Sequence, residues 1–237
     1  MTAKSHDEIV LYFGNEYPEA VVVGGVRLAL KKERRWSRTY ASDDGKTLTQ
    51  VSRFMDGTAD IALGEIESSW SSWSREDRID FCHAASWLGD HPDLQPILRH
   101  IMAHGEPLDW STLSVAIASN LPREEACEFL GSALMKSTAG SGSNFAQGLA
   151  ITKQSGASDV LRRRLDVLHV HPEFVTDDKN VNWIALEATT CIAALLQLGV
   201  PPAELEETAR RLAQHACAGN RQSAALHLRA YYPGFFV

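Results

Sequence analysis

One pattern of apolar and small residues recurs every 32 residues between residues 77 and 168. Each copy begins with a large apolar residue, and a small residue follows three positions later. Further apolar or small residues follow sixteen and twenty positions after the first. The positions are Phe81, Leu113 and Phe145; Ala84, Ala116 and Gly148; Ile97, Phe129 and Leu161; and Ile101, Ala133 and Leu165. Such spacings keep side chains on one face of a helix or of its partner. The fixed period therefore predicts helix pairs stacked as a solenoid, which is a prediction of shape rather than function.

Start and stop signals divide the chain into further helices. The expected helices are 94–104, 109–120, 123–136, 145–154, 157–170, 181–198, 203–218 and 221–231, with a break at Gly156. Two segments interrupt the regular spacing. STAGSGSN at 137–144 predicts a flexible loop, and HPEFVTDDKN at 171–180 is an insertion that moves the next register residue, Ala185, to 40 residues after Phe145. Irregular segments of a repeat usually carry its specificity, so function is expected near them.

The first 57 residues have a different pattern. Two β-rich runs flank Gly24-Gly25, and two more, at 36–41 and 47–54, flank a turn sequence. Both arrangements predict hairpins. A helix from Pro18 to Trp36 is the alternative, although three valines followed by two glycines make a poor helix.

The expected fold class is therefore mainly α, an α-solenoid of helix pairs with a short β-rich N-terminal segment. The turn-like sequence MDGT at 55–58 is the expected boundary. It separates the β-rich segment, residues 1–57, from a helical repeat domain, residues 58–237.

Composition and net charge limit the classes of partner that we expect for this chain. The 237 residues carry a net charge of −7, whereas a general nucleic-acid binder needs excess lysine and arginine to neutralise phosphates. No apolar run reaches the roughly 18 residues that a membrane-spanning helix needs, and the first seven residues do not resemble a signal segment. Four cysteines without a CxxC pair, Cys82, Cys127, Cys191 and Cys217, predict free and largely buried thiols. We expect a cytoplasmic protein with a basic protein partner, no membrane association and little tendency to bind nucleic acid; the sequence predicts no oligomeric state.

The helix pairs resemble those of the HEAT-repeat class of α-solenoids over about residues 60–232. The residues that carry the resemblance are Ala84, Ala85, Leu88 and Gly89; Ala116, Ile117, Leu121 and Pro122; Ala188, Ile192 and Leu195; and Ala224, Ala225 and Leu228. The aspartate and arginine that this family often has at fixed helix positions are not regular here. The resemblance implies a curved stack of helix pairs whose inner helices bind a partner. HEAT-like proteins are mostly binding scaffolds and inhibitors, and a minority are DNA glycosylases that act on alkylated bases.

No pattern predicts a catalytic centre, a cofactor or a metal site. His100 and His104 lie four residues apart on one helix face, a spacing that can hold a metal, but no acid stands between them. A helix C-terminus also stabilises imidazolium without a metal. His169, His171 and Glu173 begin the densest group of metal-ligand residue types, for which a solvated loop is the simpler interpretation.

Two basic runs and five tryptophans are further candidates for a surface role. Residues 27–38 contain six basic side chains and one acid, and residues 162–164 are three arginines on one expected helix. A solvated strand edge explains the first run, and a patch for an acidic partner or phosphate is the alternative. The tryptophans are expected mainly in the core and between repeats: Trp70, Trp73, Trp87, Trp110 and Trp183. Trp70 and Trp73 lie among serines, so one of them could face outward as a binding hot spot.

Acidic residues fall at similar stages of successive helix pairs, and stacking would align some of them in a stripe. Ordinary placement at helix starts explains such acids; the alternative is a surface that covers a basic protein. The expected partner-binding residues are Trp70, Trp73, Glu106, Asp109, Glu124, Glu128, Glu173, Asp177 and Asp178.

The sequence favours a non-enzymatic protein-binding module. Its most specific form is an acidic immunity-type inhibitor that masks a cognate toxin or enzyme. Two alternatives stay open. One is an enzyme that acts on nucleic acid, resembling the HEAT-like DNA glycosylases, which would need a basic groove with an acid and aromatic residues at its centre. The other is a structural adaptor, which has no enzyme to silence.

Overall fold

The computed structural model describes the backbone of residues 20–23, 26–29, 32–41 and 47–56, and the backbone and side chains of residues 70–75, 78, 82, 94–176 and 181–236. The chain divides into two compact units, residues 1–120 and 121–237. In its described part the protein is mainly α, as predicted, with eight α-helices. No helix in these ranges is both long enough and apolar enough to span a membrane.

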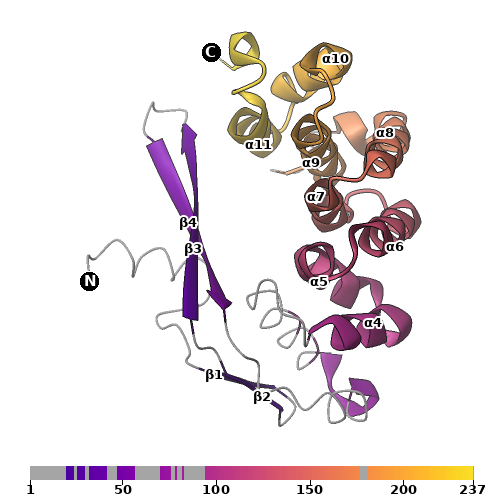
Figure 1. The fold of residues 1–237 in the computed structure, drawn as a ribbon. Coiled ribbons are helices and arrows are strands. Elements are labelled where there is room, and N and C mark those ends of the chain that lie inside the picture. Colours follow the sequence, from indigo (N-terminus) through magenta and orange to yellow (C-terminus); the bar gives the residue numbers. More distant parts are fainter. Residues whose placement is uncertain are drawn as a thin grey trace. The chain divides into compact units, whose positions relative to one another are not determined.

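The strands of the first unit form two separate antiparallel hairpins (Figure 1). Their bounds are β1 (Ala20–Val23), β2 (Val26–Ala29), β3 (Lys32–Ala41) and β4 (Thr47–Asp56). β1 pairs with β2, and β3 pairs with β4. The predicted β-rich segment at 1–57 and its boundary with the helices stay predictions, because the side chains that would pack this segment lie outside the described residues.

Further along, the first unit contains a short 3₁₀ turn, η1 (Trp70–Ser72), and two helices, α4 (Leu94–His104) and α5 (Pro107–Asn120), that pack against each other. The indole nitrogen of Trp110 donates to the carbonyl oxygen of Ile101 at 2.9 Å, which ties α5 to the end of α4. The carboxylate of Asp109 accepts the backbone N–H of Glu106 at 2.8 Å. An acid that reaches back three residues in this way caps the start of a helix.

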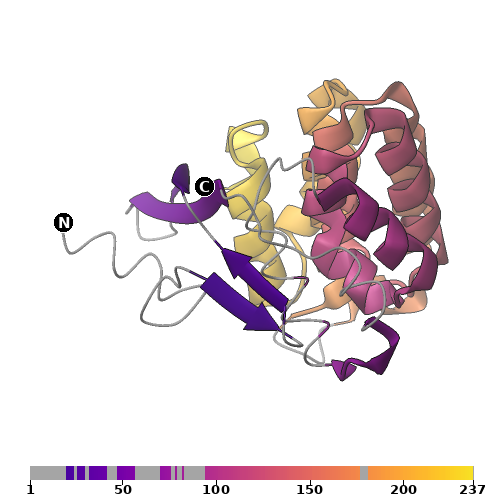
Figure 2. The ribbon, with the colours of Figure 1, turned by 60° about the horizontal axis from the view of Figure 1, so that its bottom comes forward.

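The described residues of the second unit form six α-helices. They are α6 (Arg123–Lys136), α7 (Ser143–Thr152), α8 (Ser155–His169), α9 (Trp183–Gln197), α10 (Pro202–Ala213) and α11 (Ala218–Leu228), with 3₁₀ turns η2 (Pro172–Val175) and η3 (Pro233–Phe235). α7, α9 and α11 lie in one row, and α6, α8 and α10 lie in another (Figure 1). α9 contacts both α7 and α11, α6 contacts α8, and the rows pack against each other. The view in Figure 2 shows the same helices side by side. This packing is compatible with an α-solenoid-like arrangement of residues 121–236.

The periodic residues found in the sequence are core residues. All of those in the described ranges are buried except Phe129, which is half-buried. Ala185, the register residue after the insertion, is also buried. The 32-residue period therefore identifies the buried faces of α4 to α8, on which the small residues Ala116, Ala133 and Gly148 let neighbouring helices approach closely.

Two predicted helix boundaries are wrong for identifiable reasons. The break after α7 is at Lys153, whose φ of 54° is left-handed, whereas Gly156 lies in the first turn of α8. A left-handed residue is a common way to end a helix. The second error is at the end of α10, which stops at Ala213, because the ring of His215 accepts the N–H of Cys217 at 3.1 Å and turns the chain into α11.

Candidate binding groove

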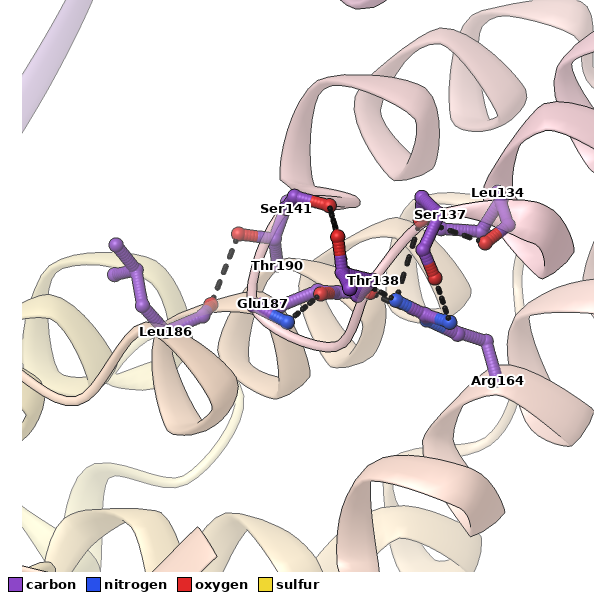
Figure 3. Close-up of polar contacts among 9 residues, drawn as sticks. Leu134, Ser137, Thr138, Ser141, Arg164, Leu186, Glu187 and Thr190 are labelled. Carbon is purple, nitrogen blue, oxygen red and sulfur yellow. Dashed lines mark hydrogen bonds and ion pairs between the residues drawn. The ribbon is translucent and has the colours of Figure 1, made fainter. Parts of the chain in front are cut away.

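The segment predicted as a flexible loop folds over a buried ion pair (Figure 3). The Nε atom of Arg164 lies 2.5 Å from a carboxylate oxygen of Glu187, and both side chains are buried. The guanidinium of Arg164 also donates to the carbonyl and the hydroxyl of Ser137 and to the carbonyl of Thr138. The second carboxylate oxygen of Glu187 accepts the N–H of Gly140 at 2.6 Å. Residues 137–142 therefore form a loop, as predicted, and the buried pair of charges bonds to its backbone at Ser137, Thr138 and Gly140; the flexibility of this loop stays a prediction.

Two glycines allow this close approach. Gly140 has a φ of +92°, in the region that favours glycine. A side chain at Gly142 would meet the carboxylate of Glu187. Gly140 and Gly142 thus allow the loop to pack closely against α9.

Trp183 is exposed, contrary to the prediction of a core position. Its side chain is 61% exposed at the first position of α9. The preceding residue, Asn182, caps this helix by accepting the N–H groups of Ile184 and Ala185. The register of α9 then directs Ile184 and Ala185 into the core, and Trp183 outward.

The three arginines at 162–164 point in different directions. Arg162 binds Glu204 of α10 at 2.6 Å on the surface. Arg164 binds Glu187 of α9 in the interior. Arg163 is exposed and lines a groove against α6. Successive residues on a helix are about 100° apart, so this run does not form the basic patch considered from the sequence.

An open groove of about 490 Å³ runs between α6 and α8. Its floor includes Gly131, and a side chain there would lie within 3.3 Å of Val160, so the two helices are close at this point. Met135 adds apolar surface, with 37% of its side chain exposed. The complete lining is Glu124, Cys127, Glu128, Gly131, Ser132, Met135, Gln154, Gly156, Val160 and Arg163.

The two walls of the groove run in the same direction. Cys127, near the start of α6, lies beside Thr152, which comes just before α8. Gly131 lies beside Val160. Ser137, just after α6, contacts Arg164. Residue numbers on α6 and α8 increase together along these contacts, so the helices are parallel.

Charges are therefore unevenly placed along the groove. Glu124 and Glu128 lie at the end formed by the N-terminal half of α6, and Arg163 lies toward the other end. All three side chains are exposed, and none forms an ion pair with a residue in the described ranges. Two carboxylates against one guanidinium leave the groove acidic, and its charges have no internal partners.

Cys127 is the thiol on the groove wall. Burial raises its pKa, and the nearby Glu128 carboxylate adds to the increase. All four cysteines are free; three are buried and Cys127 is half-buried, which agrees with the sequence prediction. At neutral pH the Cys127 thiol is protonated, which suits a wall position rather than a nucleophile.

The first half of the predicted insertion is anchored by one buried side chain, whereas Pro172, Glu173 and Val175 are exposed. Phe174 in η2 is buried, and its carbonyl accepts the Nε2–H of His215 at 2.8 Å. Asn182 donates to the carbonyls of Glu173 and Thr176. These contacts anchor residues 171–176 to the ends of α9 and α10.

A reciprocal amide pair joins the same region to α11. The backbone N–H of Asn182 donates to the side chain of Asn220, and the side-chain amide of Asn220 donates to the carbonyl of Asn182, each at 2.7 Å. Both residues are buried, so the side-chain amide of Asn220 depends on the backbone of residue 182 for its hydrogen bonds.

The expected partner-binding residues lie in different places. Trp70 and Trp73 are buried, with ring centroids 5.8 Å apart. The guanidinium of Arg78 lies 3.2 Å from the exposed Glu106 and 4.0 Å from the buried Asp109. The same guanidinium lies 5.9 Å from the Trp70 ring centroid, so Arg78 groups Trp70 and Trp73 with Glu106 and Asp109 in the first unit. Glu124 and Glu128 share one groove wall in the second unit; Glu173 is exposed elsewhere, and Asp177 and Asp178 lie outside the described residues. The partner-binding role of this set stays a prediction.

The histidine pairs considered from the sequence have local contacts. The rings of His100 and His104 stack at 4.5 Å, and Nδ1 of His104 donates to the carbonyl of His100. The ring of His169 meets Phe174 edge-on, and His171 accepts the N–H of Glu173. In the part of the chain that the structure describes, no three histidine, cysteine or acidic side chains are grouped so that they could hold a metal.

Compared with known proteins, the chain matches no family model, no curated protein and no solved structure. The function must therefore be argued from the groove. The sequence indicated its acidic wall through Glu124 and Glu128, but not Arg163, Val160 or the groove itself, because the pairing of α6 with α8 depends on tertiary packing.

Proposed function

We propose that this chain is a protein-binding module whose α6–α8 groove holds a basic segment of another protein. The observation that carries the proposal is the pair of exposed carboxylates, Glu124 and Glu128, on the wall of an open groove with an apolar floor. Unpaired charges beside apolar surface suit a partner that supplies both cations and apolar contacts. In its most specific form the module is a cytoplasmic, immunity-type inhibitor built as a HEAT-like solenoid, which covers the basic face of a toxin or enzyme.

The charge of the groove does not favour the glycosylase-like alternative. A groove for nucleic acid needs an excess of cations to neutralise phosphates, whereas this groove has Arg163 against Glu124 and Glu128. A structural adaptor would use the same surface in the same way. It differs from an inhibitor only in what happens to the partner after binding.

Binding of short basic helical peptides, measured by fluorescence anisotropy at several salt concentrations, tests the proposal. The test variant is Glu124→Gln with Glu128→Gln. The matched control is Asp166→Asn with Glu207→Gln, which also removes two exposed carboxylates but leaves the groove intact.

We expect the groove variant to weaken binding roughly 2- to 30-fold, since each exposed charge pair contributes about 0.2–1 kcal/mol. The control should bind like the unmodified chain, and added salt should weaken all binding. Equal losses in both variants would show that net charge, and not the groove, attracts the peptide. No binding of any basic peptide would refute the proposal.

A further inference from the structure

The groove also limits which segment it can hold. We propose that its occupant is an α-helix that runs antiparallel to α6 and α8, with an acidic residue in its first turn and two basic residues toward its C-terminus. This inference rests on the proposed function and names the partner segment for the same groove. It follows from the lining of the groove, the direction of its walls and the order of its charges.

The occupant is a helix because the groove offers it no backbone to pair with. Both walls are helices, whose interior N–H and C=O groups are already used in their own hydrogen bonds. A segment that binds by strand addition needs an open sheet edge. A helix satisfies its own backbone and presents a row of side chains, so it suits a groove lined by side chains.

The contacts across the groove set the spacing of the charges. Gly131 lies beside Val160, and Ser137 lies beside Arg164, so Arg163 is level with about residue 135 of α6. Glu128 is then about seven residues away along α6, and Glu124 about eleven, which correspond to about 10 and 16 Å at 1.5 Å per residue.

A helix that complements these charges has an acid at position i, an apolar residue at i+4 and basic residues at i+7 and i+11. At about 100° per residue, these four positions fall on one face. The acid would meet Arg163, the apolar residue would lie over Gly131, and the two basic residues would meet Glu128 and Glu124.

The antiparallel direction of the occupant follows from the helix dipoles. α6 and α8 are parallel, so their N-terminal ends, with partial positive charge, lie together at the carboxylate end of the groove. An antiparallel occupant places its C-terminus, with partial negative charge, at that end. Its basic residues then lie near its own C-terminus and its acid near its N-terminus, where each charge also stabilises the isolated helix. In a parallel occupant the basic residues would lie near its N-terminus and the acid near its C-terminus, where the helix dipole disfavours each charge.

Two designed helical peptides of identical composition test the charge order. Peptide A has the acid at i, the apolar residue at i+4 and the bases at i+7 and i+11. Peptide B has the acid at i+7 and the bases at i and i+11, which suits the groove in neither direction. In fluorescence anisotropy we expect peptide A to bind at least about tenfold more tightly, which corresponds to about 1.4 kcal/mol.

A charge swap identifies the contact with Arg163. We expect Arg163→Glu to weaken the binding of peptide A. Replacing the acid at i of the peptide with lysine should restore binding to this variant. The matched control is Arg162→Glu, on the adjacent surface position that pairs with Glu204, for which no such rescue is expected. Rescue by both variants, or by neither, would overturn the assignment of Arg163.

Alkylation of Cys127 can report the direction in which peptide A lies in the groove. It lies on the groove wall, level with position i+8 of an antiparallel peptide A. Peptide A with a bromoacetyl group at i+8 should alkylate Cys127 faster than the same peptide with the group at i+1, and faster alkylation from i+1 would overturn the antiparallel direction.

The outcomes separate this inference from the proposed function. If peptides A and B bind equally and both depend on Glu124 and Glu128, the groove still holds basic segments and the charge order is wrong. If neither binds at millimolar concentration, both proposals fail.

Discussion

Removal of Arg164 should destabilise the second unit far more than removal of its neighbour Arg162. Arg164 and Glu187 form a buried ion pair, with side chains 3% and 0% exposed. Replacing Arg164 with methionine leaves a buried carboxylate and the carbonyls of Ser137 and Thr138 without their donor. Breaking one side of such a pair costs about 3–5 kcal/mol. Domains of this size have total stabilities of about 5–15 kcal/mol, so the loss would be a large fraction of the whole.

Arg162→Met is the matched control, because the same substitution two residues earlier breaks an ion pair of similar length. The side chains of Arg162 and Glu204 are 40% and 47% exposed. Solvent screens such a pair, so we expect a loss of at most about 1 kcal/mol. The two variants thus remove the same kind of ion pair, which is buried in one case and exposed in the other.

Urea unfolding followed by circular dichroism at 222 nm measures both losses. Native-state hydrogen exchange adds a local measurement, because the N–H of Gly140 donates to Glu187 and should lose protection in Arg164→Met. In the double variant with Glu187→Gln, the loss should be smaller than the sum of the single losses by about 1–3 kcal/mol. The reasoning is refuted if Arg164→Met costs no more than Arg162→Met, or if the double variant is strictly additive.

Three further predictions concern other parts of the second unit. Asn182→Ala should cost about 1–3 kcal/mol in urea unfolding, because it removes the cap of α9 and the donor to the carbonyls of Glu173 and Thr176; Asn182→Asp should recover the cap but not the bonds to these carbonyls. Burial and the nearby Arg211 lower the pKa of His169, so its unfolded form binds more protons near pH 6. Its contribution to stability is complete above the usual histidine pKa and is lost as pH falls from that value through the lowered pKa of the folded state; between pH 7.5 and 5.5 the free energy of unfolding should decrease less in His169→Gln than in the unmodified chain. Native alkylation should modify Cys127 before the buried cysteines, slowly at pH 7 because its pKa is raised, and mass spectrometry of Cys127→Ser should then show no early adduct.

The sequence predicted the helices well where local signals decide them. α4 and α6 have the predicted bounds, since Pro96 and Pro122 lie at helix starts and an apolar face continues to the last turn. The errors come from contacts between distant residues. Nothing within residues 137–144 indicates that Arg164 and Glu187 will satisfy that loop, because those partners lie on two later helices.

The candidate site was predictable only in part, for the same reason. The acidic wall was visible because Glu124 and Glu128 are four residues apart on one helix. The second wall depends on which helix packs beside α6, and the 32-residue period indicates this only as a tendency of equivalent helices to stack. The close contact of Gly131 with Val160 is the detail that creates the groove floor.

The arginine run shows why pairing matters more than composition for this groove. Helix geometry alone separates residues 162–164 by about 100° each, but it does not say which of them stay without a partner. Glu204 neutralises Arg162 and Glu187 neutralises Arg164, so of these three arginines Arg163 is the one that lines the groove without an ion pair among the described residues. If all three guanidinium groups faced α6, they would outnumber the two carboxylates, and the groove would suit an acidic segment. The proposed preference for a basic segment therefore depends on two ion pairs that lie outside the groove, because they hold Arg162 against Glu204 and Arg164 against Glu187.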